Sequence, residues 1–575
     1  MPGTAVSNQR KLLVLSNLSL VLSLMGCTGG PSDSDSKADD EIGSESGGSG
    51  TDSTGGDTTS TTDTTTETGD GDGDVECFDG VAPLPFDASA SEVGYDLPAP
   101  DFAIDELRGP QTLAEFWTGC ENHVFVIYAG NWWGTPIDPL VDDSDPDTHY
   151  WFIDAAQGHD LDMRTAIVGQ IAQKVEARLE ALGPEVHAAR TSQFHYVLTP
   201  GLDIPLVTGI LAANPNEAHF TVDRHQLVRE GHNVAVFAGS WTPLLQQTRY
   251  WAKYFNAQYA LDAALADEEA SGDVLVERVA DGVEIKGGEP FTWTLPDAAT
   301  IAEYDRLAID LRVGCPGAGH PYVATCGEWD TIASIWLCST PDCSEPDKRR
   351  IVKWITPYSS PGRWLIDITP ELLALAEGGE LTFVSAHGDN DVGQYTYRYT
   401  ADLRFSKSED GLRPIASDPL VVDGNYGWDA NYHMMWNEFV VTPPPGTERV
   451  ELVAKISGHG GAEGSNCAEF CSFTHEFTIG GTAFGHQYLM ENADRCAESV
   501  ALGVTPNQGG TWFYDRSSWC PGWVIEEWSA DVSAAIDLGG ETSISYASWF
   551  GNQQPPTGGG ATMDAKVELV YYGAP

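Results

Sequence analysis

Basic residues are scarce in this sequence, which holds 30 Lys and Arg against 85 Asp and Glu and carries a formal net charge of −55. A surface of that sign repels phosphate backbones and anionic lipid headgroups, so we expect no nucleic-acid partner. A long apolar run is also missing. The apolar run at residues 12–25 is interrupted by small polar residues and is too short for a membrane-spanning helix.

That short apolar run indicates export. Arg10 and Lys11 precede it, and it ends in "LMGC", residues 24–27, which resembles the lipobox of bacterial lipoproteins. Residues 1–27 are therefore interpreted as a lipoprotein signal peptide with Cys27 as the lipidated residue. An ordinary cleaved signal peptide with a chance cysteine is the alternative. We expect an exported lipoprotein of the bacterial outer membrane or cell surface, in contact with the membrane only through the lipid anchor.

Residues 28–80 contain little that a folded domain could bury. They consist almost entirely of Ser, Thr, Gly, Asp and Glu up to residue 76, which predicts a disordered linker that repels itself. The segment "DGDGD", residues 70–74, has the oxygen ligands of a calcium loop. The later glycine and glutamate of an EF-hand are absent, so we expect no calcium there.

Cysteines are few and lack metal-binding spacing. No Cys-x-x-Cys pair occurs and no cysteine has a histidine at the usual zinc spacing, so disulfides are favoured over the competing zinc site. Without Cys27 the total of 11 leaves ten, an even number that suits disulfides in an exported chain. Pairing near neighbours in sequence order predicts Cys77–Cys120, Cys315–Cys326, Cys338–Cys343, Cys467–Cys471 and Cys496–Cys520.

The chain is long enough for about three domains, and residues 81–272 combine helix and strand patterns. Apolar residues at helical spacing predict a helix over 162–182 that ends at Gly183-Pro184, and Thr242-Pro243 predicts the start of a second helix. Short apolar strands are expected at "HVFVIYAGN" and "HNVAVFAGS". The first is followed by "NWWGTP", residues 131–136, an order that resembles a thioredoxin-like domain without its redox cysteines, so thiol exchange is excluded.

After residue 272 the pattern changes to alternating apolar strands between Gly, Pro, Asn and Asp turns. Three such strands are "RLAIDLRVG", "ERVELVAKISG" and "AKVELVYYG". Many short strands with few helices predict a mostly β region built as sandwiches or jelly rolls. A break near residues 409–419 divides it into residues 273–410 and 411–575.

Three segments combine acids, aromatics and cysteines. "CGEWD" carries Glu328, Trp329 and Asp330, "NCAEFC" carries Glu469, and "DRSSWCPG" carries Arg516 and Trp519. A short disulfide-closed step holds a carboxylate in one direction, as proton transfer requires. Taken singly, either acid segment is more simply explained as an ordinary surface or strand-end carboxylate.

Taken in order with "CPGAGHPYVATCGEWD", "WITPY" and "SGHGGAEGSNCAEFCSFTHEF", these segments resemble the peptide-N-glycosidase F family of amidases, which remove whole N-linked glycans. The resemblance runs from near Val274 to the C-terminus. It implies two eight-stranded antiparallel jelly rolls side by side, with an active site in the cleft between them. The residues 81–272 look like the extra N-terminal domain of longer family members.

The resemblance also implies residue roles. The family's catalytic aspartate falls on Asp330, the general acid and base, and its second glutamate falls on Glu469. Substrate contacts are implied for Arg516 and Trp519, with Trp519 offering a flat face to a sugar ring. We also expect Glu328, Trp329 and His459 to contact substrate. No cofactor is implied, and the expected partners are N-linked glycoproteins or glycopeptides. We expect the protein to be a monomer.

Several positions depart from the family pattern. The family's other glutamate falls near Ala386, and only a small shift would let Asp389 replace it. Thr331 stands where the family has an arginine, His459 where it has a tryptophan, and a second family tryptophan falls near Gly388. The departures put substrate identity in question more than fold, and they favour a non-catalytic glycan-binding or adhesion lipoprotein as the rival hypothesis.

Histidines raise a third hypothesis, because copper monooxygenases share the double jelly roll and bind metal through His-x-His, further histidines and a methionine. This chain has no His-x-His. We therefore expect no bound metal. The candidates weighed were His459, His475, His486 and His433 with Met434 and Met435.

Overall fold

The computed structural model describes residue 77 and residues 82–574. The exceptions are 129–136, 143, 214–218, 231–241, 317–325, 328, 345–347, 359, 388–395, 433–437, 461–466, 489–494, 508–511, 513–515, 517, 552, 554 and 556–559. Cys27, the linker and the predicted strand at residues 232–240 lie outside these ranges. No helix of the described part is long and apolar enough to cross a membrane.

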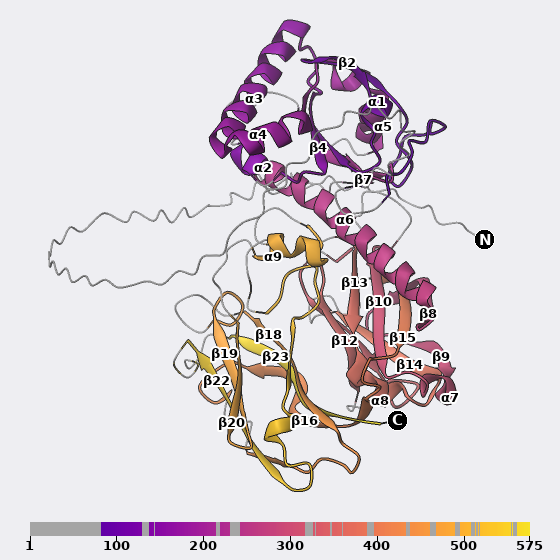
Figure 1. Cartoon of the computed structure of the whole chain (residues 1–575), viewed down its shortest axis with the longest axis vertical. Coiled ribbons are helices and arrows are strands. Elements are labelled where there is room, and N and C mark those ends of the chain that lie inside the picture. Colours follow the sequence, from indigo (N-terminus) through magenta and orange to yellow (C-terminus); the bar gives the residue numbers. More distant parts are fainter. Residues whose placement is uncertain are drawn as a thin grey trace, which may run out of the picture. The chain divides into compact units, whose positions relative to one another are not determined.

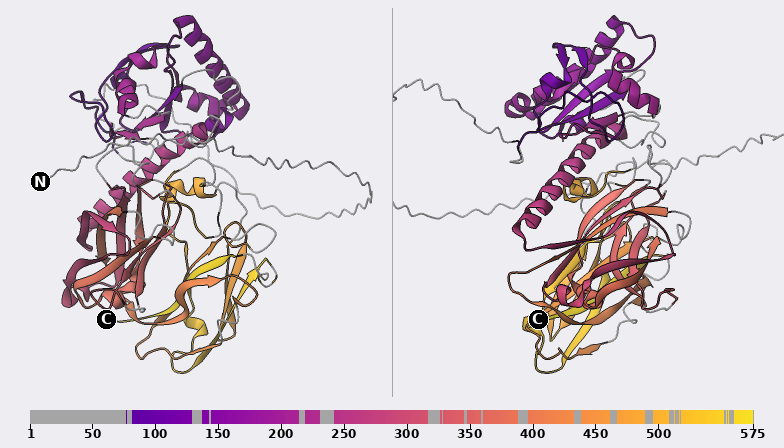
Figure 2. Two further views of the ribbon diagram at one scale, coloured as in Figure 1. Left: turned by 180° about the vertical axis from the view of Figure 1, so that it is seen from behind. Right: turned by 90° about the vertical axis from the view of Figure 1, so that its right-hand side faces the viewer.

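The first folded unit is a mixed sheet with helices on both faces (Figures 1 and 2). The strand order is β5-β4-β3-β6-β7, with β3, β4 and β5 parallel and β6 and β7 antiparallel to their neighbours. The strands are β3 (Asn122–Tyr128), β4 (Thr148–Asp154), β5 (Phe194–Tyr196), β6 (His219–Val222) and β7 (Val228–Glu230), with a separate hairpin of β1 (Ala103–Glu106) and β2 (Gly109–Thr112). The thioredoxin-like description stays a prediction.

The two helices that the sequence predicts in this unit are present as α3 and α6. Helix α3 (Leu161–Leu182) is capped by Asp160 and stops at Gly183, whose φ of 106° favours glycine. The predicted apolar face of α3 is buried at Ile167, Ile171, Val175 and Leu179. The others are α1 (Leu113–Phe116), α2 (Asp138–Asp142), α4 (Pro184–Arg190), α5 (Pro205–Ala213) and α6 (Thr242–Ser271).

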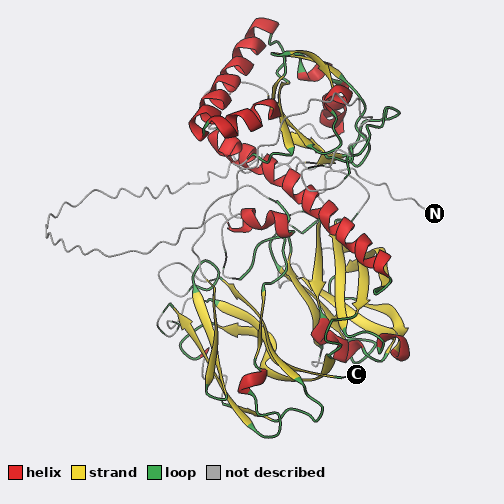
Figure 3. Cartoon of the chain, viewed as in Figure 1, coloured by secondary structure: helices red, strands yellow, loops and turns green. Residues whose placement is uncertain are grey.

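Two β-sandwiches follow, each made of two four-stranded sheets (Figure 3). The first contains β8 (Leu275–Lys286), β9 (Pro290–Asp297), β10 (Arg306–Gly314), β11 (Ile332–Leu337), β12 (Arg349–Ile355), β13 (Gly362–Asp367), β14 (Gly378–His387) and β15 (Thr396–Ser406). Its short helices are α7 (Ala298–Ile301) and α8 (Leu372–Leu375). Its sheets run β13-β10-β15-β8 and β12-β11-β14-β9.

The second sandwich repeats this order. It contains β16 (Arg413–Gly427), β17 (Phe439–Val441), β18 (Arg449–His459), β19 (Phe473–Ile479), β20 (Thr482–Tyr488), β21 (Glu527–Asp531), β22 (Thr542–Phe550) and β23 (Thr562–Gly573), with helix α9 (Arg495–Glu498). Its sheets run β16-β23-β18-β21 and β17-β22-β19-β20. Counting eight strands from the first in each sandwich, both have the sheets 1-8-3-6 and 2-7-4-5. The prediction of two antiparallel jelly rolls is confirmed.

The apolar residues that alternate along the predicted strands fill both cores. Leu307, Ile309, Leu311 and Val313 of β10 point into the first core. Val450, Leu452, Ala454 and Ile456 of β18 and Val567, Leu569 and Tyr571 of β23 point into the second. Because strand side chains alternate between faces, the intervening residues are free to carry the charges that join the two sandwiches.

Those charges form a buried network. Arg350 and Lys353 on β12 reach Asp564 on β23, with Nη1 and Nζ at 2.8 and 2.6 Å from Oδ1, and Arg350 also pairs with Asp423. The two cations hold the pKa of Asp564 well below its ordinary value, despite burial that acts to raise it. Removing one partner would leave a buried charge unpaired, so this network fixes how the sandwiches meet.

Helix α6 contacts all three units. Its Asn256 accepts a hydrogen bond from Asn122 of β3 at 2.9 Å, and its Asp262 pairs with Arg363 of the first sandwich at 2.7 Å. Tyr250, Trp251 and Tyr254 pack against Cys496, Cys520 and Trp512 of the second sandwich. The helix thus lies directly under the segment that the Cys496–Cys520 disulfide closes.

Candidate active site

The structure joins the same five cysteine pairs that the sequence predicts. Three of them frame the segments singled out above. Cys315–Cys326 precedes Asp330, Cys467–Cys471 encloses Glu469, and Cys496–Cys520 holds the segment with Arg516 and Trp519. Each disulfide therefore anchors a loop that supplies one component of the site.

The backbone on both sides of Asp330 is held by one threonine. Thr356 Oγ1 donates to the Trp329 carbonyl at 2.7 Å and accepts from the Thr331 amide at 2.8 Å. Thr356 N also donates to the Thr331 carbonyl at 3.0 Å. Asp330 stands two residues before β11 begins and is oriented by these bonds rather than by a helix or strand of its own.

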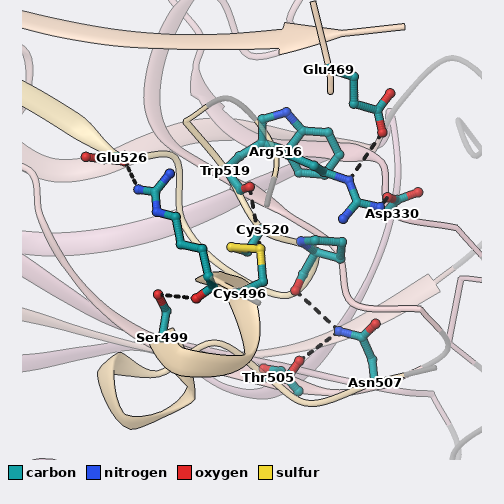
Figure 4. The surroundings of a disulfide bond; sticks show 12 residues. Asp330, Glu469, Cys496, Ser499, Thr505, Asn507, Arg516, Trp519, Cys520 and Glu526 are labelled. Atoms are coloured by element: carbon teal, nitrogen blue, oxygen red, sulfur yellow. Dashed lines mark hydrogen bonds and ion pairs between the residues drawn. A yellow bond between two sulfur atoms is a disulfide. The ribbon is translucent and has the colours of Figure 1, made fainter. Parts of the chain in front are cut away.

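Arg516 links the two acids from the two sandwiches (Figure 4). Its Nη2 lies 3.4 Å from Asp330 Oδ2, and its Nε lies 3.2 Å from Glu469 Oε1. The arginine side chain is only 1% exposed, whereas the carboxyl groups of Asp330 and Glu469 are 15% and 23% exposed. The cation is thus sealed beneath two carboxylates that reach the surface.

Glu469 is held by its own loop as well. Its Oε2 accepts from the Gly460 amide at 3.1 Å, and the Ala468 amide donates to the Gly460 carbonyl at 3.1 Å. Because Gly460 directly follows β18, these bonds fasten the disulfide-closed loop to the sheet. One carboxylate oxygen is occupied by Gly460 and the other by Arg516.

Burial dominates the electrostatics of Asp330. It raises the pKa of this carboxyl from its ordinary value to about 6, although Arg516 and a hydrogen bond from Tyr358 act in the opposite direction. The nearby Glu469 carboxylate raises it further. A carboxyl group with a pKa near 6 can accept a proton and return it near neutral pH, which is what a general acid and base requires.

Trp519 does not occupy the place that the sequence predicts. It is 2% exposed, its ring stacks on His459 with centroids 5.1 Å apart, and the Arg516 guanidinium lies 4.8 Å from its centroid. Its indole N–H donates to the Gly458 carbonyl at 2.8 Å. The expectation that Trp519 offers a flat face to a sugar is corrected. His459 and Arg516 cover its ring, so Trp519 packs beneath the Arg516 guanidinium.

The exposed aromatic side chains next to the acids are different ones. Trp329 is 54% exposed beside Asp330, and Phe470 is 43% exposed beside Glu469. The Arg516 guanidinium also lies 5.0 Å from the Phe470 ring centroid. A substrate contact by Trp329 stays a prediction. Phe470 was not singled out from the sequence, although it stands inside "NCAEFC".

Several predicted positions can be placed only in part. Glu328, Gly388 and Asp389 lie outside the described residues. Ala386 lies on β14 in register with Ser334 of β11, so no carboxylate stands at that point of the sheet. Tyr358 contacts Asp330, and Thr356 contacts the peptides that flank it, but neither residue was assigned a role from the sequence. Both lie in the "WITPY" segment, which was the signal that could have identified them.

Within the described ranges, no three His, Cys, Asp or Glu side chains are grouped so that they could hold a metal ion. His475 is buried with its Nδ1 2.5 Å from the Tyr546 hydroxyl, and His486 stacks on Trp528. His433, Met434 and Met435 are outside the described part.

Comparison with known proteins gives one family match. Residues 430–566 match the family model described as "Peptide-N-glycosidase F, C terminal". The paired jelly rolls define the class, a double-sandwich β protein. The match of residues 430–566 to the C-terminal domain of the peptide-N-glycosidase F family confirms the resemblance seen in the motifs. No curated protein sequence matches the chain.

Solved structures give a weaker likeness. Recombinant peptide: N-glycanase F (PNGase F) is 20% identical with a TM-score of 0.41, covering 53% of this chain and 96% of that one. PNGase F from Flavobacterium meningosepticum, titled a glycosylasparaginase, is 19% identical with a TM-score of 0.41 over 52% and 96%. PNGF-II is 12% identical with a TM-score of 0.38 over 54% and 67%. At these values we rest no inference about activity on them.

Proposed function

We propose that this protein is an amidase of the peptide-N4-(N-acetyl-β-glucosaminyl)asparagine amidase type, which cleaves the asparagine side-chain amide and releases N-linked glycans. The observation that carries the proposal is the buried Arg516 shared between Asp330 and Glu469, with the pKa of Asp330 raised to about 6. The match of residues 430–566 to the peptide-N-glycosidase F family supports the substrate class.

In the proposed reaction the Asp330 carboxylate accepts a proton from water, whose oxygen attacks the amide carbon. The same carboxyl then gives that proton to the departing nitrogen as the carbon–nitrogen bond breaks. The peptide keeps an aspartate and the glycan leaves as a 1-amino sugar. Hydrolysis of that sugar releases ammonia, and the atoms balance with water as the only co-substrate.

Arg516 and Glu469 have supporting roles in this proposal. The guanidinium, sealed from solvent, acts through its two carboxylates: it holds Asp330 and Glu469 in place and favours the charged form of Asp330. Glu469 is held by Gly460 and Arg516 in one orientation, which suits the positioning of water or of a sugar hydroxyl. Trp329 and Phe470 are the exposed aromatic surfaces available to sugar rings.

Non-catalytic glycan binding is the second candidate, and Ala386 favours it, because it stands where the family pattern has another glutamate. A denatured N-linked glycoprotein separates the two candidates. The amidase converts glycosylated asparagine to aspartate, which mass spectrometry detects, and Asp330→Asn abolishes the conversion. A pure binding protein retains glycopeptide without converting it.

We also propose that this activity takes place at the cell surface. An exported lipoprotein anchored through Cys27 would meet glycoproteins at the cell surface, with residues 28–80 as the tether between the anchor and the folded units. Labelling with a radioactive fatty acid, compared between the wild-type protein and Cys27→Ala, tests the anchor directly.

A further inference from the structure

Arg516 and Trp519 are the two ends of one tight turn. They form an isolated antiparallel bridge, and the Trp519 amide donates to the Arg516 carbonyl at 3.4 Å. A hydrogen bond from the fourth residue back to the first is typical of a β-turn, so Ser518 occupies the third position. The conformation of this turn therefore sets the direction in which the Arg516 side chain leaves the backbone.

Ser518 adopts a backbone conformation that is unfavourable for serine. Its φ is 74°, in the left-handed region, where the Cβ atom of any residue but glycine crowds the backbone. Glycine and asparagine are the usual residues with positive φ at the third position of a turn. Among the described residues other than glycine, positive φ also occurs at Asp96, Gln226 and Cys343, which lie outside the proposed site. Such a conformation persists only where the surrounding structure holds it.

Hydrogen bonds to two neighbouring segments hold Ser518 in this conformation. Its hydroxyl donates to the Ile456 carbonyl of β18 at 2.5 Å, and its own carbonyl accepts from the Glu526 amide, just before β21, at 3.2 Å. The direction of the first bond is unambiguous, because a carbonyl oxygen can only accept. Ser518 is fully buried, so solvent does not compete for these bonds.

The hydroxyl bond fastens the turn to a part of β18 that its neighbouring strand leaves unpaired. Within the described residues, β21 pairs with β18 only as far as Lys455. At the next residue the Ser518 hydroxyl bonds to the Ile456 carbonyl. Two residues further along, the Gly458 carbonyl accepts from the indole N–H of Trp519 at 2.8 Å. The serine hydroxyl is thus one of two side-chain contacts that fix the turn on the strand.

We propose that Ser518 is a positioning residue, whose hydroxyl bond offsets the strain of the left-handed turn and so holds the Arg516 guanidinium against Asp330 and Glu469. It rests on the proposed function in one respect, that Asp330 is the acting carboxyl. Burial and Glu469 raise the pKa of Asp330, whereas Arg516 and Tyr358 lower it. A guanidinium displaced from Asp330 therefore raises that pKa further.

Two substitutions separate the hydroxyl bond from the backbone strain. Ser518→Ala keeps the Cβ atom and its strain but removes the bond, so the turn leaves the left-handed conformation and Arg516 is displaced. Ser518→Gly removes the bond and the strain together, since glycine adopts a φ of 74° without cost. We expect kcat/KM to fall by about tenfold in Ser518→Ala and by less in Ser518→Gly. A role in packing alone predicts the opposite order, because glycine removes more of the buried side chain.

The pKa of Asp330 gives a second readout that needs no activity. NMR on protein labelled with ¹³C at aspartate, assigned by comparison with Asp330→Asn, measures it directly. We expect the pKa of Asp330 to be highest in Ser518→Ala, lower in Ser518→Gly and lowest in the wild-type protein. Ser533→Ala is the matched control, because Ser533 Oγ accepts from the Val450 amide at 2.8 Å near the opposite end of β18 and its φ is not positive. It should leave kcat/KM and the pKa of Asp330 unchanged.

An equal pKa of Asp330 in Ser518→Ala and the wild-type protein overturns the positioning role, as does a lower kcat/KM for Ser518→Gly than for Ser518→Ala. Failure of Ser518→Ala to fold where Ser518→Gly folds supports it, because only the alanine variant retains the strain; the reverse result contradicts it. A wild-type protein that fails to convert asparagine, while its variants show the expected order of pKa values, overturns the amidase proposal alone. The two failures are therefore distinguishable.

Discussion

Arg516 of the second sandwich lies 3.4 Å from Asp330 of the first, Nη2 to Oδ2, although 186 residues separate them in sequence. The same guanidinium reaches Glu469 with its Nε. Two acids that approach one another from separate domains would repel without this cation, so Arg516 joins the site and opposes the rise in the pKa of Asp330 that burial causes.

Removing the charge of Arg516 should raise the pKa of Asp330 further, because Arg516 is the largest influence that lowers it. We expect Arg516→Met to move the acid limb of the kcat/KM profile to higher pH and to lower kcat/KM by about a hundredfold, because Asp330 and Glu469 lose the cation that positions them. Arg516→Lys keeps a charge without the planar fork, so its shift should be smaller. An unchanged pH profile in Arg516→Met contradicts the assigned role.

The pH dependence of the wild-type protein follows from the pKa of Asp330. The carboxylate form is the base, so kcat/KM should fall as pH drops below about 6, where burial has raised this pKa. Steady-state assays on a glycopeptide across pH 4 to 8, a span of about two pKa units on either side, test this. An acid limb near the ordinary pKa of aspartate would contradict the burial of Asp330.

Asp330 should cost stability at neutral pH. Its folded-state pKa of about 6 exceeds its ordinary value of 3.8, so the folded protein gains from protonation below pH 4 and loses that gain as pH rises through 6. The difference corresponds to at most about 3 kcal/mol. Asp330→Asn should therefore raise Tm at pH 7.5 and leave it nearly unchanged at pH 4. A lower Tm for Asp330→Asn at pH 7.5 would show that the carboxylate is stabilising.

The Cys467–Cys471 disulfide should matter more for activity than for stability. Replacing both cysteines by alanine frees the loop that aims Glu469, and we expect kcat to fall by about tenfold. Cys338–Cys343 closes a similarly short loop outside the site, with a sequence separation of 5 against 4. Both double variants should lose about 2 kcal/mol of stability, while only the first loses kcat. Equal kcat losses would contradict the assignment.

Helix α6 should support the site through Tyr254. This side chain is buried against Cys496 and Cys520. Tyr254→Ala should lower the free energy of unfolding by about 3 to 5 kcal/mol and reduce kcat as well, because the Arg516 segment loosens. Tyr259 lies farther along the same helix and contacts residues of the α/β unit, namely Asp223, Arg224, His225 and Arg229. Tyr259→Ala is the control and should leave kcat unchanged.

The fold was largely predictable because alternation in β10, β18 and β23 is a local property of the chain. The helix boundaries at Asp160, Gly183 and Thr242 were predictable for the same reason. The strand order within each sandwich is not local, and it was not predicted; the strand pattern indicated sandwiches or jelly rolls, and the family resemblance implied two of them.

The site was predictable in its components but not in its contacts. Asp330, Glu469 and Arg516 were recognised from their cysteine-framed segments, and the structure brings them together. The role of Trp519 was wrong because its burial depends on His459 and Arg516, which no spacing in the sequence reveals. Thr356 and Lys353 were missed since each acts through a partner distant along the chain.

The central claim is that Asp330 drives hydrolysis of the asparagine side-chain amide. It is tested most directly by incubating a denatured N-linked glycoprotein with the protein in ¹⁸O-labelled water and examining the former glycosylation site by mass spectrometry. The account predicts aspartate carrying one labelled oxygen for the wild-type protein and unaltered glycosylated asparagine for Asp330→Asn. No conversion by the wild-type protein, or equal conversion by Asp330→Asn, would contradict it.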